Sequence, residues 1–257
     1  GLGDDPGPGA GADGGAGVSQ VRYPHRATKR LEGLESLNGP RLHDRIYGEV
    51  LVAGLDFRRD QVEEYSENIA LLGTLREVHR EYSDEAGPFG DMFGEYMECN
   101  GETSERNGQF FTPIDVVDMM VQMTLQDTPL DRQEPWMFCD PACGTGRFML
   151  RTAHHFAKEN KGALNFLFTN VDIDRKAFTY CTMNAVLNGI PGIHIHGDTL
   201  RMEVWDAFAT VPIGQVAPWT RVRPETAKAW LVQALQAPTP TPTVRQETVQ
   251  TSLEAGA

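Results

Sequence analysis

The chain has 257 residues, of which 40% are hydrophobic and 23% charged, and its formal net charge is -13. This composition is typical of a soluble globular protein, and no apolar run approaches the roughly 18 residues that a membrane helix needs. The acidic balance argues against a broad basic surface for nucleic acid. The four cysteines lack paired CxxC spacing, which suggests neither a zinc cage nor a disulfide framework, and no secretory h-region is visible. We therefore expect a cytoplasmic protein with reduced thiols and no contact with a membrane.

Composition divides the chain into four segments. Residues 1–24 form a Gly/Asp-rich arm that we expect to be disordered, and residues 237–257 form a Pro/Thr-rich tail that we expect to be extended. Residues 25–105 are expected to be a helical amino-terminal region, and residues 106–236 an α/β domain. Because the first residue is Gly rather than Met, the chain could be processed or could be one piece of a longer product.

Apolar residues at three- and four-residue spacing predict helices in the amino-terminal region. The stretch 62–82 has this pattern with charges between the apolar positions, and Pro88 and Gly90 break it. A second, shorter helix is expected over 91–99. Two arrangements are open: a helical cap, or helices that simply pack on the main domain.

The rhythm after residue 113 is that of an α/β unit. Strands are expected over 136–140, 164–172, 193–198 and 206–214, and helices over 114–125, 146–160, 175–189 and 224–236. Strands that alternate with helices of this length predict a parallel sheet with crossover connections.

The most informative motif is the turn "DPACGTG" after the first strand. Asp140 ends the strand, and Gly144 and Gly146 let the backbone approach a ligand with no Cβ in the way. The helix that follows adds a partial positive charge suited to a carboxylate. A P-loop would need a lysine after the glycines and a dinucleotide site would prefer GxGxxG, whereas Gly146 is followed by Arg147 and Phe148. An acid for an ammonium group beside backbone N–H groups for a carboxylate fits an amino-acid-like ligand.

Two more acids follow the next two strands. Asp172 is placed to accept hydrogen bonds from both ribose hydroxyls of a nucleoside, and Asp198 could accept from an adenine amino group. Each acid alone is more often a helix cap. Ammonium, carboxylate, ribose and adenine together describe S-adenosylmethionine, which we therefore predict as the cofactor.

The segments "NGQFFTP" and "DPACGTGRFM", with "DMFGEYME" before them, resemble the adenine-N6 DNA methyltransferases that serve as modification subunits of type I restriction systems. The resemblance covers about residues 88–200. It implies a Rossmann-like S-adenosylmethionine-dependent methyltransferase fold with a helical amino-terminal extension, and a separate specificity subunit that reads the DNA. It also implies that the cofactor is held by "FTP", with its Thr and Pro at the methionine end, by the glycine loop and by the two later strand ends: Phe111, Thr112, Pro113, Asp140, Pro141, Ala142, Cys143, Gly144, Thr145, Gly146, Asp172, Ile173 and Asp198.

The chain departs from this family after the fourth strand. Family members carry Asn-Pro-Pro-Phe or Asn-Pro-Pro-Tyr there, because the Asn oxygen and a backbone carbonyl localise the adenine N6 lone pair and the aromatic ring stacks on the flipped base. This chain has "ATVPIGQ", in which the Asn position falls on Val211 or Thr210 and only Pro212 survives. Thr210 and Pro212 are retained as degenerate catalytic candidates. We also expect a truncated sheet, since the resemblance implies further strands after the fourth.

Several alternatives stay open at this point. The chain is an active methyltransferase with a divergent motif, a cofactor-binding half completed by another methyltransferase fragment, or a relic that binds cofactor or partners without methyl transfer. A small-molecule or protein methyltransferase is a further alternative, because the cofactor loop is shared across substrates. The histidines lack a third ligand at suitable spacing, so no metal site is expected. Cys143 lies near a helix amino terminus that could lower its pKa, but the resemblance implies a small packing residue.

Overall fold

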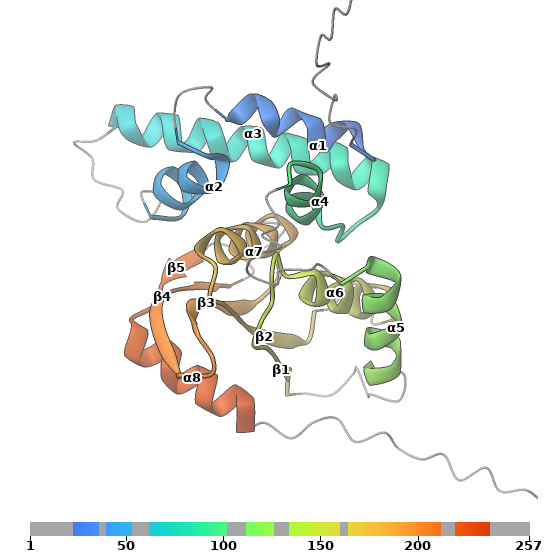
Figure 1. The fold of residues 1–257 in the computed structure, drawn as a ribbon, viewed down its shortest axis with the longest axis vertical. Helices are drawn as coiled ribbons and strands as arrows, with labels where there is room; N and C mark the ends of the chain where they lie inside the picture. Colours follow the sequence, from blue (N-terminus) through green and yellow to red (C-terminus); the bar gives the residue numbers. More distant parts are fainter. Residues whose placement is uncertain are drawn as a thin grey trace, which may run out of the picture.

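The computed structural model describes residues 23–35, 40–52, 62–101, 112–125, 134–159, 164–211 and 219–236, with only the backbone of 62–69. In these ranges the chain is a mixed α/β protein in which helices cover a five-stranded sheet (Figure 1). No helix in these ranges is long and apolar enough to cross a membrane. The expected tail and all but the last two residues of the expected arm lie outside the described residues.

The sheet has a parallel half and an antiparallel half. In chain order, which is also the order across the sheet, its strands are β1 (Trp136–Asp140), β2 (Phe166–Asp172), β3 (Gly192–Asp198), β4 (Glu203–Thr210) and β5 (Trp219–Arg221). β1, β2 and β3 are parallel to one another. β4 runs antiparallel to β3, and β5 antiparallel to β4.

The prediction of a parallel sheet is therefore right for three strands and wrong for the fourth. Only the turn 199–202 connects β3 to β4. A parallel return needs a crossover of about a dozen residues or more, whereas two antiparallel strands can be joined by a short turn. The strand expected over 206–214 consequently begins earlier, at Glu203, and runs back along β3. Its expected end, from Pro212 onward, lies outside the described residues.

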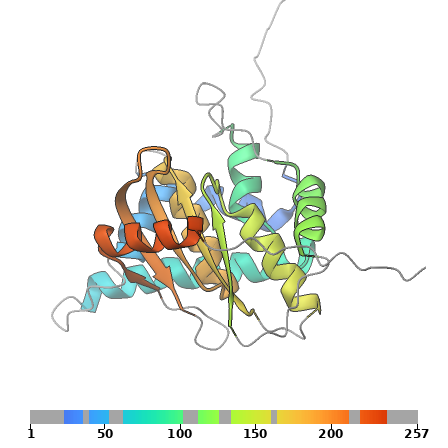
Figure 2. The ribbon, with the colours of Figure 1, turned by 90° about the horizontal axis from the view of Figure 1, so that it is seen from below.

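Helices cover both faces of the sheet. α6 (Arg147–Glu159) and α7 (Arg175–Asn188) connect the parallel strands, and buried side chains from one side of each helix share a hydrophobic cluster with Phe138 and Phe168. α5 (Ile114–Leu125) packs on α6. α8 (Pro224–Gln236) packs across the opposite face, where Leu231 meets Val171 and Ile195 (Figure 2). The bounds of β1, α5 and α8 agree with the ranges expected from the sequence.

The amino-terminal helices lie on the outer side of α7 (Figure 1). They are α1 (Arg26–Arg30), α2 (Leu42–Arg45), α3 (Val62–Ala86) and α4 (Met92–Cys99), with a short 3-10 turn η1 (Glu32–Leu34) and a π-helical segment η2 (Ile46–Val52). Phe93 of α4 stacks on Tyr180 of α7 with ring centroids 4.8 Å apart. The helices share one hydrophobic cluster with α7 and β4, which favours packing on the main domain over a separate cap.

Candidate functional site

Three acids end the three parallel strands. Asp140 closes β1, Asp172 closes β2 and Asp198 closes β3. Because the carboxyl ends of adjacent parallel strands meet at one edge of a sheet, the structure brings the three positions to the same edge, as the sequence predicted.

The glycine loop between β1 and α6 is fixed against the end of β2 by backbone hydrogen bonds. The Cys143 N–H donates to the Val171 carbonyl at 2.9 Å, and the Gly144 N–H donates to Asp172 Oδ2 at 2.8 Å. Gly144 and Gly146 have φ of 55° and 87°, a left-handed region that favours glycine. A Cβ on Gly146 would lie 2.8 Å from the Cys181 sulfur. The loop is therefore a tightly packed turn, and only glycine fits at position 146.

Asp172 is the acid most closely tied to the loop. Its two carboxylate oxygens accept from the Gly144 N–H and, at 2.8 Å, from the Asp174 N–H, and the residue is 8% exposed. Burial raises the pKa of Asp172 to about 6, although the two N–H donors act in the opposite direction. A carboxylate oxygen has room for more than one hydrogen bond, so Asp172 keeps acceptor capacity for ligand hydroxyls.

The other two acids differ in how fully they are used. Oδ1 of Asp140 accepts from the Ala142 N–H at 3.2 Å, and burial raises the pKa of this carboxyl. Asp198 instead caps the turn into β4, because its Oδ1 accepts from the Leu200 and Arg201 N–H groups at 2.9 and 3.1 Å. The capping role, which is the common one for an acid at a strand end, therefore applies to Asp198. Asp140 accepts one hydrogen bond from the described residues and so keeps more acceptor capacity for a ligand.

The remaining cofactor candidates divide by exposure. Thr112 and Pro113, at the start of α5, are exposed, as are Pro141 and Ala142 of the loop; Ile173 is 60% exposed, whereas Cys143 and Thr145 are buried. The Thr112 carbonyl accepts from Arg147 Nη1 at 2.8 Å, which brings the start of α5 to the start of α6. Phe111 lies outside the described residues.

Sequence reasoning missed Asp91, the residue just before α4. Asp91 is 3% exposed and accepts from Thr145 Oγ1 at 2.7 Å, from Arg147 Nε at 3.0 Å and from Asn184 Nδ2 at 3.0 Å. Asp91 also caps α4 by accepting from the Gly94 N–H at 2.9 Å. The only sequence signal was this cap position inside "DMFGEYME", which does not reveal the contacts with the loop.

Thr210 lies at the opposite end of the strands from the three acids. It pairs with Gly192, the first residue of β3, whereas the three acids stand at the strand ends. The length of β3 separates the two edges by about 20 Å, at roughly 3.3 Å per residue. The expectation that Thr210 is a catalytic residue near the cofactor does not fit this geometry. Because β4 runs antiparallel to β3, Thr210 lies far from the acids. Pro212, the other catalytic candidate, lies outside the described residues.

The Thr210 hydroxyl is also fully used within the core. It donates to the Ile190 carbonyl at 2.6 Å and lies 3.1 Å from Nε2 of His194, whose Nδ1 lies 3.2 Å from Asn170 Nδ2. Burial lowers the pKa of His194 to about 3, so its ring is neutral at physiological pH. A neutral ring that accepts at Nδ1 and donates at Nε2 satisfies this chain, which gives Thr210 and His194 structural roles.

The thiols and histidines give no sign of nucleophilic or metal chemistry in the described ranges. Burial raises the pKa of Cys143 well above its usual value, with the Cys181 thiol as the next cause, so Cys143 stays a protonated packing residue. Cys181 is buried as well, and burial raises its pKa. No cluster of His, Cys, Asp and Glu that could hold a metal ion occurs among the described residues.

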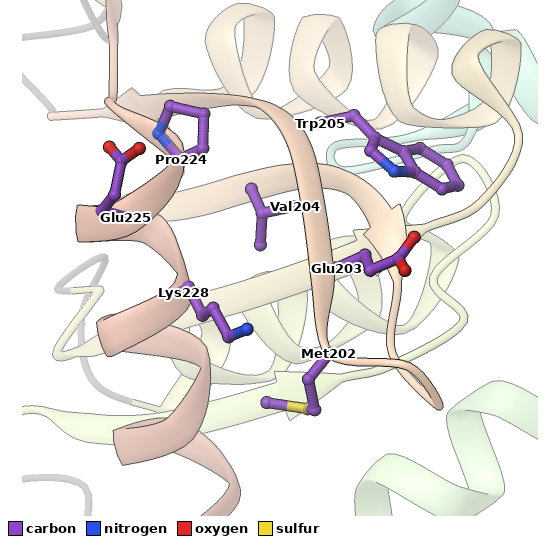
Figure 3. A pocket seen from close by; sticks show the side chains of 7 residues that line it. All are labelled: Met202, Glu203, Val204, Trp205, Pro224, Glu225 and Lys228. Carbon is purple, nitrogen blue, oxygen red and sulfur yellow. The ribbon is translucent and has the colours of Figure 1, made fainter.

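A cavity of about 320 Å³ opens on the α8 side of the sheet (Figure 3). It lies between α8 and the start of β4 and is lined by Met202, Glu203, Val204, Trp205, Pro224, Glu225 and Lys228. Trp205 is 45% exposed and contacts the ring of His196 edge-on, with ring centroids 4.9 Å apart. None of the three acids lines this cavity, so it is separate from the candidate site.

Comparison with known proteins assigns the family. No solved structure matches the chain. The sequence model of the N-6 DNA methylase family matches residues 85–217, just over half of the chain. This span contains α4, the glycine loop, the three acids and β4. The chain therefore belongs to the N-6 DNA methylase family.

Proposed function

We propose that the protein is an adenine-specific DNA N6-methyltransferase, similar to the modification subunits of type I restriction systems, with a Rossmann-like domain that binds S-adenosylmethionine at the carboxyl edge of β1, β2 and β3. The observation that carries the proposal is the glycine loop held by Asp172 beside Asp140, inside the span that matches the family. Members of this family generally use S-adenosylmethionine, which supplies an electrophilic methyl group when bound.

The charges at the loop fit such a ligand. Asp140 is a half-buried residue whose carboxyl pKa is raised by desolvation, and a cationic group beside it would offset the cost of its ionisation, as the ammonium of S-adenosylmethionine can. Asp172 would accept from the ribose hydroxyls, and the exposed Ile173 next to it would contact the adenine ring. These contacts belong to the donor half of the reaction.

The loop offers fewer donors for the ligand carboxylate than its sequence suggests. The N–H groups of Ala142, Cys143, Gly144 and Gly146 are already bonded to protein acceptors. At the start of α6, the Leu150 N–H donates to the Gly146 carbonyl at 2.9 Å, which ties the helix to the last glycine of the loop. The start of a helix carries a partial positive charge that favours anions, and we propose that the amino terminus of α6 helps to bind the carboxylate.

The acceptor half supports a second candidate function. The described residues do not bring Thr210 to the acids, and no Asn-Pro-Pro-aromatic tetrad occurs in the chain. This favours a cofactor-binding subunit that acts with a complementing methyltransferase fragment. In either case we propose that a specificity subunit or another partner holds the DNA, because the chain carries a net charge of -13.

Calorimetry with S-adenosylmethionine is the first test. The wild-type protein should bind it, and Asp172→Ala should weaken binding by about tenfold or more, since it removes an acceptor for the ribose and the carboxylate that holds the Gly144 N–H of the loop. Asp118→Ala, on α5, is the matched control and should bind like the wild type. Absence of wild-type binding overturns the proposal.

Methyl transfer separates the two candidate functions. Labelled S-adenosylmethionine is incubated with adenine-containing duplex DNA, first with the chain alone and then with the products of neighbouring reading frames. Transfer by the chain alone supports the methyltransferase, and transfer that needs a second polypeptide supports the cofactor-binding subunit. Cofactor binding without transfer in both mixtures overturns both forms of methyl transfer.

A further inference from the structure

Asp91 connects three separate parts of the candidate site. Its carboxylate accepts from Thr145 in the glycine loop, from Arg147 at the start of α6 and from Asn184 in the middle of α7. Asn184 Nδ2 also donates to the Thr145 carbonyl at 2.9 Å, so both the side chain and the backbone of Thr145 are held. A carboxylate that is 3% exposed is stable as an anion only when donors surround it, and these residues supply them.

Arg147 extends the network to the start of α5. Its Nε donates to Asp91, while Nη1 reaches both the Thr112 carbonyl at 2.8 Å and Glu98 at 3.1 Å. Burial lowers the pKa of Arg147, but the charges of Asp91 and Glu98 outweigh that effect and raise it. Glu98 is 43% exposed and Asp91 only 3%, so Asp91 is the inner partner that fixes the guanidinium.

The approach of α4 to this network depends on Gly94. A Cβ on Gly94 would lie 1.9 Å from Asp91 Oδ2 and 2.9 Å from Arg147 Nη2. No other residue fits there while the carboxylate keeps its contacts. Glycine in the first turn of a helix costs stability unless close packing requires it, which indicates that the contact between α4 and the loop is specific.

α4 is also attached to the other amino-terminal helices, α1 and α3. Glu95 lies 2.6 Å from His25 Nδ1, at the start of α1, and accepts from the Tyr82 hydroxyl of α3 at 3.3 Å. Figure 1 shows α4 between these helices and α7. α4 therefore connects the amino-terminal helices, through Asp91, to the glycine loop.

We infer that Asp91, acting through Thr145 and Arg147, is a positioning residue for the methionine end of the S-adenosylmethionine pocket. It holds the glycine loop and the Thr112 backbone in one arrangement, so the amino-terminal helices take part in cofactor binding. The inference rests on the proposed function, since it concerns the same pocket. It assigns Asp91 no contact with the ligand.

α6 offers an internal control for a purely structural ion pair. Arg151, one helical turn after Arg147, pairs with Asp118 of α5 through two hydrogen bonds. This pair is also partly buried, with side chains 18% and 34% exposed, and its two hydrogen bonds join α6 to α5 rather than to the glycine loop. A variant that only weakens the packing of α5 on α6 should resemble the loss of this pair.

The test compares two ligands on matched variants. Asp91→Asn and Asp118→Asn are titrated with S-adenosylmethionine and with 5′-methylthioadenosine, which lacks the amino acid group, and thermal unfolding is followed in parallel. Asp91→Asn should lose about tenfold or more in affinity for S-adenosylmethionine, and 5′-methylthioadenosine should bind within about twofold of wild type. Asp118→Asn should bind both ligands as the wild type does.

The result that overturns the inference is a folded Asp91→Asn protein that binds S-adenosylmethionine like the wild type, or one that loses the same factor for both ligands. If Asp91→Asn does not fold, Gly94→Ala gives the same comparison, because it displaces the carboxylate and keeps its charge. Arg147→Lys, which keeps the charge and loses the fork to Thr112, should repeat the ligand-selective loss. A wild-type protein that binds neither ligand overturns the proposed function itself.

Discussion

The parallel and antiparallel halves of the sheet belong to one continuous sheet, yet only the parallel half carries the candidate site. In the parallel half, each strand delivers its last residue to the same edge, where the loops can surround a ligand. In the antiparallel half, β4 returns to the opposite edge and ends in the core at Thr210. Strand direction, and not residue type alone, decides which polar residues can act together.

Each half is anchored to the amino-terminal helices by one buried aspartate. Asp91 serves the parallel half and touches the glycine loop. Asp206 of β4 serves the antiparallel half, where it accepts from the Tyr47 hydroxyl at 2.6 Å and from Arg221 Nε at 2.9 Å. Of these two aspartates, only Asp91 contacts residues of the proposed pocket. Substitutions in the parallel half should therefore change cofactor affinity, and substitutions in the antiparallel half should change stability alone.

The largest separation is expected from Gly146→Ala in the parallel half. Gly146 has a φ of 87°, and the added Cβ would lie 2.8 Å from the Cys181 sulfur. The alanine side chain therefore forces the loop to shift. Affinity for S-adenosylmethionine, measured by calorimetry, should fall by about 100-fold, the loss that a misplacement of about 1 Å can cause. Gly73→Ala in α3, where a Cβ meets nothing within 4 Å, is the control and should leave affinity unchanged. Equal affinity in both variants would mean that the loop does not form the pocket.

The antiparallel half should respond in the opposite way to Thr210→Val. The change leaves the Ile190 carbonyl and His194 Nε2 without their partner in the core, which should lower the free energy of unfolding by about 1–3 kcal/mol in urea titrations. Cofactor affinity should stay within about twofold, because the residue is distant from the acids. Thr74→Val, whose hydroxyl donates to the Ala70 carbonyl in a solvent-exposed hydrogen bond on α3, should change stability by about 0.5 kcal/mol or less. Loss of methyl transfer at wild-type stability would instead return Thr210 to the acceptor site.

A smaller effect, on pH dependence, is expected from Asp172. Its pKa of about 6 means that lowering the pH from 7 to 5 protonates the carboxylate that should accept from the ribose, so S-adenosylmethionine affinity should fall by about tenfold. The raised pKa of Asp140 has the same sign. Asp172→Asn should bind weakly and remove most of this pH dependence. An unchanged pH profile in Asp172→Asn would show that another group titrates.

The ligand-free protein should show the opposite trend at this residue. The unfolded carboxyl titrates near pH 4, so between about pH 4 and 6 the folded state binds a proton that the unfolded state does not. Asp172 therefore contributes stability below this window that is lost as the pH rises through about 6. The difference in unfolding free energy between wild type and Asp172→Asn, followed across this range, measures the contribution.

Much of the parallel half could be predicted from the sequence. Periodicity and the residues at the ends of elements placed β1, α5 and α8 correctly, and the acids at the strand ends followed from the general geometry of parallel sheets. The direction of β4 was missed, although the turn 199–202 is too short for a crossover. β5 has three residues, which is too few for any pattern to indicate.

Asp91 could not be found from local pattern. Its partners Thr145 and Asn184 lie 54 and 93 positions away in the chain, and each contact depends on how α4 packs on α7. The sequence shows only an Asp that begins a helix, which is the commonest use of an Asp in that place. The packing of α4 on the main domain places the Asp91 carboxylate at the centre of a hydrogen-bond network with the glycine loop, α6 and α7.

The smallest effect in this comparison is expected at Cys143, in the middle of the glycine loop. Its thiol is 7% exposed and its pKa is raised by burial, so it contributes neither a thiolate nor a contact at the surface of the loop. Cys143→Ala should bind S-adenosylmethionine within about twofold of wild type and lose about 1 kcal/mol of stability, the cost of a small cavity.

Alkylation at pH 8 checks the same point in the unaltered protein. Cys143 and Cys181 should resist the reagent in the folded state and react only on unfolding, while the half-buried Cys99 and Cys139 react earlier. Rapid labelling of native Cys143 that also blocks cofactor binding would contradict this assignment. Protection together with normal binding by Cys143→Ala would mean that the loop acts through its backbone and its acids, as the hydrogen bonds to Asp172 and Val171 indicate.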